Sequence, residues 1–113
     1  MRTTTGISAF LLSLALAHPL FAQSQAIKVA GLVELSGTGT TSGTNFNDGV
    51  KLAVKEINAA GGILGRQIEY TPSDTQTNPG VAKALAQKAV DDGAYVVMGP
   101  VFSGSIVVSM AET

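Results

Sequence analysis

The sequence predicts an α/β fold with a Rossmann-like, three-layer parallel sheet. Short aliphatic segments alternate with amphipathic segments of helical period, in the order strand, helix, strand, helix, strand, helix, over residues 27–113. The connections between these segments are short, which favours parallel strands joined by right-handed helical crossovers. Of the 113 residues, 45% are hydrophobic and 13% are charged, a balance typical of a packed core and not of a disordered chain.

Residues 1–22 are predicted to be a secretory signal peptide that lies outside the fold. Arg2 gives a positively charged start, residues 7–16 form an apolar core, and Ala22 is a small residue at the predicted cleavage point. Cleavage as late as Ala26 is the alternative. A membrane anchor is disfavoured, because the apolar core is about half of the roughly 20 residues that a membrane span needs.

The composition excludes several classes of function. The chain has no Cys, and its one His, His18, lies in the predicted signal peptide, so we expect no disulfide, no thiol catalysis and no metal site. A signal peptide without a following Cys predicts a free periplasmic protein that is not lipid-anchored. The formal net charge is -1 and no patch of Lys or Arg stands out, which is not typical of a nucleic-acid partner.

The first strand is predicted over residues 26–33, an aliphatic run typical of a buried strand. Residues 36–43 are small, polar and flexible, and they predict a loop. The following helix carries one apolar stripe and is expected to end at the glycine pair 61–62. This stripe consists of Phe46, Val50, Ala53 and Ile57, with Val54 beside them.

The second strand is predicted over residues 67–71, with a polar loop over 73–77. Asn78 as N-cap and Pro79 in the first turn then predict a second helix, which Gly93 ends. The apolar stripe of this helix consists of Val81, Leu85 and Ala89, widened by Ala82, Ala86 and Val90.

The third strand is predicted over residues 94–98, followed by a loop over 101–105 and a third helix over 106–112. Three strands bury little surface for this fold class, so we expect residues 27–113 to be an incomplete lobe.

Ligands of open parallel sheets bind beyond the carboxyl ends of the strands, where the strand order switches. Three predicted loops leave those ends, over residues 34–45, 72–78 and 99–104. If the strand order is 2-1-3, the first and third loops flank one crevice. Their hydroxyl groups predict a polar pocket that tolerates an anion. The candidate residues are Ser36, Thr38, Thr40, Thr41, Ser42, Ser103 and Ser105.

The third loop is the more specific candidate for a ligand-binding site. Residues 99–105 lead into a helix, whose free N–H groups, with a hydroxyl from Ser103 or Ser105, can hold a carboxylate without Lys or Arg. The alternative is that Ser103 or Ser105 is an ordinary helix N-cap.

A cofactor site is not expected. Gly37, Gly39 and Gly43 stand between a strand and a helix, but the dinucleotide fingerprint needs its third glycine three residues after the second, and here the spacing is four. No Lys-Ser or Lys-Thr pair follows, so a nucleotide phosphate loop is not predicted either.

Catalytic residues are not predicted. Ser103 lies outside a Gly-x-Ser-x-Gly motif. Glu34, Glu69 and Asp74 show no pairing that indicates acid–base chemistry, and we expect them to be solvated charges. Glu34 stands out only because it follows a strand beside the predicted crevice.

Several segments are distinctive: residues 27–37, 47–53, 56–66 (Glu-Ile-Asn-Ala-Ala-Gly-Gly-Ile-Leu-Gly-Arg), 74–79 and 97–100. In this order they resemble the type I periplasmic binding proteins, above all the leucine/isoleucine/valine-binding group that serves ABC importers. The resemblance implies two Rossmann-like lobes that close on a ligand, with residues 27–113 forming the N-terminal part of the first.

The resemblance also implies site residues. Ser103, with Val101 and Phe102 beside it, matches the position that holds an amino-acid carboxylate. Ser42 lies near the place of an aromatic ligand contact, and Glu34 stands where the family commonly has Pro. Both residues depart from the family's pattern, so the ligand stays open among branched-chain or other amino acids, related amides and small organic acids.

We therefore expect a non-enzymatic, substrate-binding component of an ABC importer, which captures a small solute in the periplasm and delivers it to a membrane permease. A ligand-sensing extracellular receptor domain of the same fold is the alternative. An exported α/β enzyme with catalytic residues elsewhere is a third possibility.

Overall fold

The computed structural model describes residues 25–113, and the predicted signal peptide lies outside this range. The elements are β1 (Ile27–Val33), α1 (Thr40–Ala59), β2 (Ile68–Asp74), α2 (Pro79–Asp91), β3 (Val96–Met98) and α3 (Ser103–Ser109). The alternating order and the parallel pairing confirm the predicted α/β fold.

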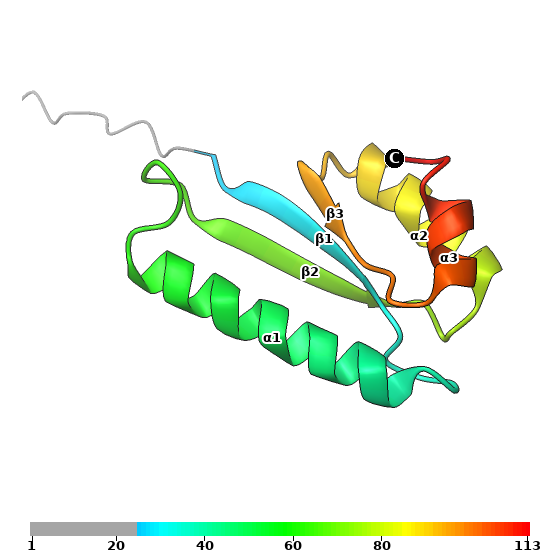
Figure 1. Cartoon of the computed structure of the whole chain (residues 1–113). Helices are drawn as coiled ribbons and strands as arrows, with labels where there is room; N and C mark the ends of the chain where they lie inside the picture. The colour runs from blue at the N-terminus through cyan, green and yellow to red at the C-terminus, as the bar shows by residue number, and fades with distance from the viewer. Residues whose placement is uncertain (1–24) are drawn as a thin grey trace, which may run out of the picture.

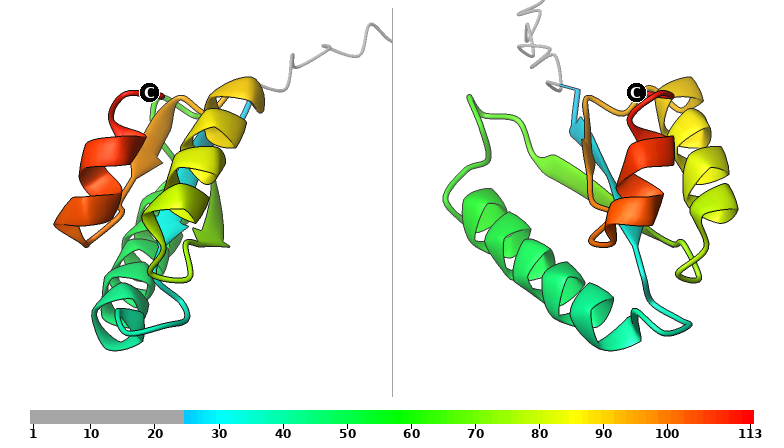
Figure 2. Two further views of the ribbon diagram at one scale, coloured as in Figure 1. Left: turned by 90° about the vertical axis from the view of Figure 1, so that its right-hand side faces the viewer. Right: turned by 45° about the vertical axis from the view of Figure 1, so that its right-hand side comes forward.

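The three strands form one parallel sheet in the order β2-β1-β3, with β1 in the middle. Helix α1 covers one face of the sheet, and α2 and α3 lie side by side on the other (Figures 1 and 2). All three strands point toward the same end of the molecule, so the loops that follow them gather there (Figure 1). This arrangement confirms the strand order that the predicted crevice requires.

The buried core lies on both faces of the sheet, with most of its helical residues on α2 and Val50 on α1. Its apolar members are Val29, Leu32, Val33, Val50, Ala82, Ala86 and Ala89. The alanine positions of the predicted α2 stripe are therefore buried, and alanine lets the helix backbone approach the sheet closely. Val81 and Leu85 are half-buried, whereas Val90, also predicted in the stripe, is 44% exposed.

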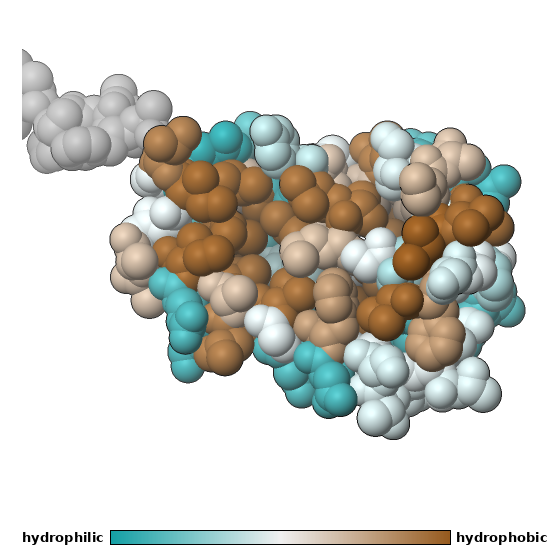
Figure 3. Space-filling view, viewed as in Figure 1, coloured by the Kyte–Doolittle hydropathy of each residue, from teal (hydrophilic) through white to brown (hydrophobic). Residues whose placement is uncertain are grey.

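The predicted apolar stripe of α1 faces the sheet, since all five of its residues line one groove against the strands. Its burial is incomplete, because Val50 is buried and Phe46 and Val54 are half-buried, but Ala53 is exposed and Ile57 is 37% exposed. Figure 3 shows apolar side chains gathered on the face that carries α1. A groove there lies between α1 and the sheet, lined by side chains that include Phe46, Val54, Ile68 and Met98.

Polar side chains attach α1 to the edge strand β2. The Asn58 side chain accepts a hydrogen bond from the Ile68 N–H (2.7 Å) and donates to the Ile68 carbonyl oxygen (2.9 Å). The Tyr70 hydroxyl donates to Asn47 Oδ1 (3.0 Å), and burial raises the pKa of Tyr70. These contacts hold α1 against the sheet where its apolar packing is sparse.

Several element boundaries differ from the prediction. Helix α1 begins at Thr40 and α3 at Ser103, each inside a segment predicted as loop, and β2 extends to Asp74. Strand β2 passes through Pro72 because it is an edge strand, where a residue without an N–H donor is tolerated.

The predicted signals for α2 are confirmed. The Asn78 side chain accepts hydrogen bonds from the Gly80 N–H (2.8 Å) and the Val81 N–H (3.2 Å), and Pro79 is the first helical residue. The helix ends at Asp91, and Gly93 follows with a φ of 77°, a conformation that favours glycine.

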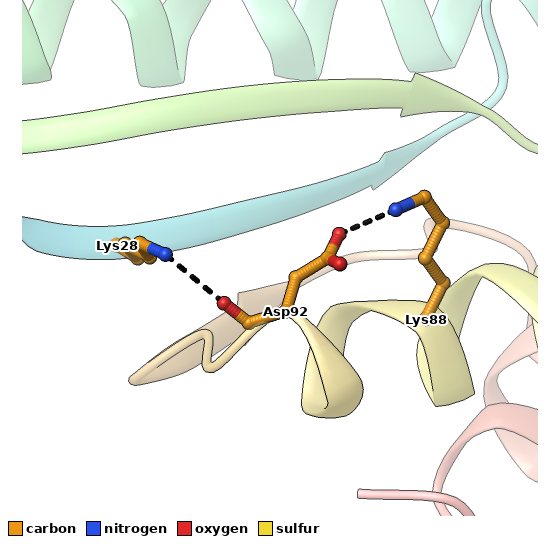
Figure 4. A network of polar contacts seen from close by, with 3 residues as sticks. All are labelled: Lys28, Lys88 and Asp92. Atoms are coloured by element: carbon orange, nitrogen blue, oxygen red, sulfur yellow. Dashed lines mark hydrogen bonds and ion pairs between the residues drawn. The ribbon is translucent and has the colours of Figure 1, made fainter.

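Asp92 connects the end of α2 to the start of β1 (Figure 4). Lys88 Nζ pairs with Asp92 Oδ2 at 2.6 Å, and Lys28 Nζ donates to the Asp92 carbonyl oxygen at 3.1 Å. Both side chains of the ion pair are mostly exposed, so the pair contributes at most about 1 kcal/mol. This network lies at the amino end of the sheet, away from the gathered loops.

Thr75 carries a buried hydroxyl group that forms no hydrogen bond within residues 25–113. Its backbone N–H donates to the Val33 carbonyl oxygen (2.8 Å), an interaction that valine retains. We therefore expect Thr75→Val to leave the free energy of unfolding unchanged or to raise it by about 1 kcal/mol, since an unpaired buried polar group is removed.

Urea denaturation checks this expectation, with Thr77→Val as the matched control. The Thr77 hydroxyl donates to the Ser36 carbonyl oxygen and accepts from the Gly39 N–H, so the control should lose about 1–2 kcal/mol. A loss of that size in Thr75→Val would show that its hydroxyl is bonded after all.

Candidate ligand-binding site

The loop after β1 is held in place by Asp74 at the end of β2. Asp74 Oδ1 accepts hydrogen bonds from the N–H groups of Leu35 (2.9 Å), Ser36 (3.1 Å) and Gln76 (2.8 Å). Asp74 Oδ2 accepts from the Ser36 hydroxyl at 2.6 Å. The expectation that Asp74 is an unengaged solvated charge is therefore wrong, because one carboxylate organises two neighbouring loops.

These contacts act on the ionisation of Asp74. Desolvation is the largest single effect and opposes ionisation, but the four hydrogen bonds together outweigh it and lower the pKa of Asp74 below its ordinary value. The carboxylate form is the one that the folded loops require.

Thr77 adds a second connection between the same two loops. Its hydroxyl donates to the Ser36 carbonyl oxygen at 2.7 Å and accepts from the Gly39 N–H at 3.0 Å. Gly37 has a φ of 79°, and a Cβ at this position would lie 2.7 Å from the Gln76 carbonyl oxygen. The turn therefore needs glycine both for its conformation and for the close approach of the second loop.

Glu34 connects the loop after β1 to the loop after β3. Its side chain is fully buried, at 0% exposure. Oε2 accepts a hydrogen bond from the Val101 N–H (3.2 Å), and Oε1 accepts from the Phe102 N–H (3.3 Å). The expectation of a solvated Glu34 is wrong, because the carboxylate lies beneath the predicted site and holds the backbone of its third loop.

Two glycines let the start of α1 approach Glu34 and Phe102 closely. A Cβ at Gly43 would overlap the carbonyl oxygen of Glu34 and lie 2.6 Å from its carbonyl carbon. A Cβ at Gly39 would lie 2.7 Å from Cε2 of Phe102. The Phe102 ring therefore lies against the start of α1, and the first and third loops meet as the strand order requires.

Val101 and Phe102 are 38% and 39% exposed beside this junction, and Ser103 is exposed at the start of α3. Phe102 is the N-cap position, and no side chain caps the helix, so the interpretation of Ser103 or Ser105 as an N-cap is wrong. Within residues 25–113 the backbone N–H groups of Ser103 and Gly104 donate to no acceptor.

The other two predicted site residues lie elsewhere. Ser105 is 2% exposed, and its carbonyl oxygen accepts a hydrogen bond from the buried Ser109 hydroxyl (2.7 Å). Its side chain is thus enclosed by protein. Ser42 lies in the first turn of α1, exposed to solvent, and not in a loop as predicted.

Within the described residues, no three His, Cys, Asp or Glu side chains are grouped as metal ligands would be. The helices of that same part of the chain are too short or too polar to cross a membrane.

Comparison with known proteins extends this description. The family model described as periplasmic binding protein matches residues 26–112. The chain is 37% identical to the Leu/Ile/Val-binding protein of Escherichia coli strain K12 over 92 residues, which are 81% of this chain and 25% of that protein. It is 34% identical to the chemotactic signal transduction system substrate-binding protein BasB of Halobacterium salinarum, over 71% of this chain and 20% of that protein.

The structure is similar to that of the branched-chain amino acid transporter substrate-binding protein LivJ from Streptococcus pneumoniae, determined in complex with isoleucine. The TM-score is 0.76 at 36% sequence identity, over 77% of this chain and 25% of that chain. This chain thus spans about a quarter of the length of the relatives it matches. Its sequence and its parallel β2-β1-β3 sheet place it in one family: the chain belongs to the type I periplasmic binding proteins, within the branched-chain amino acid group.

Proposed function

We propose that the chain forms part of the first ligand-binding lobe of an exported solute-binding protein that serves an ABC importer. The observation that carries the proposal is the free hydrogen-bonding capacity at Ser103. An exposed serine with an unpaired backbone N–H follows a loop fixed by Glu34, beside the exposed Phe102 ring. The names of the relatives, which bind Leu, Ile and Val, support an amino acid as the ligand.

In this proposal, the Ser103 hydroxyl and the Ser103 and Gly104 N–H groups donate hydrogen bonds to the ligand carboxylate. Val101 and Phe102 give apolar contact, and Ser42 contributes from the first turn of α1. The predicted role of Ser105 has less support, because that side chain is buried.

Export to the periplasm is part of the same proposal. Residues 1–22 would be removed as a signal peptide, and the mature protein would carry no lipid anchor because the chain has no Cys. Its partner would be the membrane permease of the importer. The relatives are named as binding proteins, which supports a function without catalysis.

Calorimetry of the full-length protein with L-leucine, L-isoleucine and L-valine tests the ligand class. Ser103→Ala should weaken binding about tenfold to hundredfold, because a hydrogen bond to a charged group contributes about 1.5–3 kcal/mol. Ser73→Ala, a serine change on β2 outside the gathered loops, is the control and should change Kd less than twofold. Unchanged affinity in Ser103→Ala would reject the site. Absence of binding to all three amino acids would reject the ligand class.

A second candidate is a sensory role in chemotaxis, favoured by the 34% identity to BasB. Both roles need the same ligand site, so they differ in the partner. Deletion of the gene should abolish uptake of the labelled ligand if the protein serves an importer. Loss of chemotaxis toward the ligand with unchanged uptake would favour the sensory role.

A further inference from the structure

The Glu34 carboxylate is buried, and it has no ion-pair partner within residues 25–113. Its side chain is 0% exposed, and its two hydrogen bonds, from the Val101 and Phe102 N–H groups, are long at 3.2 and 3.3 Å. The ion pairs found within residues 25–113 join Lys83 to Glu112 and Lys88 to Asp92, and neither involves Glu34. Within the described residues, no Lys or Arg side chain therefore forms an ion pair with Glu34.

The location of this charge matters for the ligand. The two residues that Glu34 holds directly precede Ser103, which is the centre of the proposed site. A charge inside a protein is screened much less than one in water, so it acts on groups several ångströms away. Glu34 also occupies two N–H groups that an anion would otherwise use.

We propose that Glu34 is a specificity-determining residue that makes this lobe select a zwitterionic or neutral ligand over a net-anionic one. In a zwitterion, the ammonium group offsets the repulsion between Glu34 and the ligand carboxylate. A neutral amide avoids that repulsion altogether, whereas a simple carboxylic acid anion does not. The inference rests on the proposed function only in placing the ligand at Ser103.

A matched ligand series in the full-length protein tests this inference. L-leucine, 4-methylpentanoate and 4-methylpentanamide share one side chain and are zwitterionic, anionic and neutral. The wild-type protein should bind the anion more weakly than the amide. Glu34→Gln should lower the ratio of the anion Kd to the amide Kd about tenfold, which corresponds to about 1.4 kcal/mol. Glu69→Gln, the same change at an exposed position on β2, should leave the gap unchanged.

A purely structural role of Glu34 predicts a different result in this ligand series. If Glu34 only held the third loop, Glu34→Gln would weaken all three ligands by the same factor, and that outcome would overturn the proposal. Glu34→Asp covers the case in which Glu34→Gln does not fold. The shorter side chain keeps the charge, so it should preserve the gap between anion and amide even if it weakens the loop. Loss of the gap in Glu34→Asp would also overturn the proposal.

An acetate titration tests the role of Glu34 without assuming that the natural ligand is an amino acid. The amide resonances of Ser103 and Gly104 can be followed by NMR as acetate is added to the wild type and to Glu34→Gln. The variant should bind acetate about tenfold more tightly, even if the leucine series binds to neither protein and the proposed ligand class fails. Equal acetate affinities would overturn the role of Glu34 and leave the ligand class untouched.

Discussion

Gly43→Ala should lower the free energy of unfolding by about 3 kcal/mol or more, a loss at the upper end of what overpacking causes. The added Cβ would overlap the carbonyl oxygen of Glu34 and approach its carbonyl carbon to 2.6 Å and its backbone nitrogen to 2.8 Å. All three atoms belong to the backbone at the end of the central strand, so no side-chain rotation relieves the overlap. Either α1 or the end of β1 has to move.

The same change should weaken the ligand site. Displacement of Glu34 shifts the acceptors of the Val101 and Phe102 N–H groups, and with them the loop that presents Ser103. We therefore expect ligand affinity to fall together with stability in Gly43→Ala.

Gly49→Ala is the matched control, because it makes the same change in the same helix where a Cβ meets no atom within 4 Å. Alanine favours a helix over glycine, so the control should gain about 0.5–1 kcal/mol. Urea denaturation of both variants measures the difference. A Gly43→Ala protein as stable as the wild type would contradict the close packing of α1 against Glu34.

Local chemistry explains which parts of the fold could be predicted from the sequence. The start of α2 depends on Asn78 and Pro79, which act within their own turn, and both were recognisable in the sequence. The start of α1 depends on contacts that are distant in the sequence. Small polar residues after Gly39 are poor helix formers, and the Gly39 N–H is bound by Thr77, 38 residues away. A sequence pattern does not contain that contact, so it predicts a loop for this segment.

The candidate site also has one part that the sequence could predict and one part that it could not. The parallel topology was enough to predict that the loops after β1 and β3 meet, because the rule depends only on strand order. The role of Glu34 could not be predicted, since its partners lie 67 and 68 residues away and are backbone N–H groups, which carry no residue signature. The signals in the sequence are its place directly after an aliphatic strand and its departure from the Pro that the family commonly has there.

Asp74→Ala should destabilise the protein by about 2–3 kcal/mol, because it removes the acceptor of four hydrogen bonds, one of them from the Ser36 hydroxyl. Asp74→Asn should cost less, since one amide oxygen can still accept from the N–H groups of Leu35, Ser36 and Gln76. Both changes loosen the first loop against the second. Urea denaturation at pH 7 measures the two losses, and equal losses would show that the charge, and not the acceptor geometry, dominates.

The lowered pKa of Asp74 gives this contribution a defined pH dependence. A carboxyl group whose pKa is lower in the folded protein than its ordinary 3.8 stabilises the fold fully above that value and loses this contribution as the pH falls through the folded-state pKa. The wild type should therefore lose stability more steeply than Asp74→Asn does as the pH falls below about 4. Asp91→Asn is the control, because Asp91 is exposed and accepts one hydrogen bond, from Gln87, so it should keep the wild-type slope. If Asp74→Asn kept that slope too, the loop would not depend on an ionised Asp74.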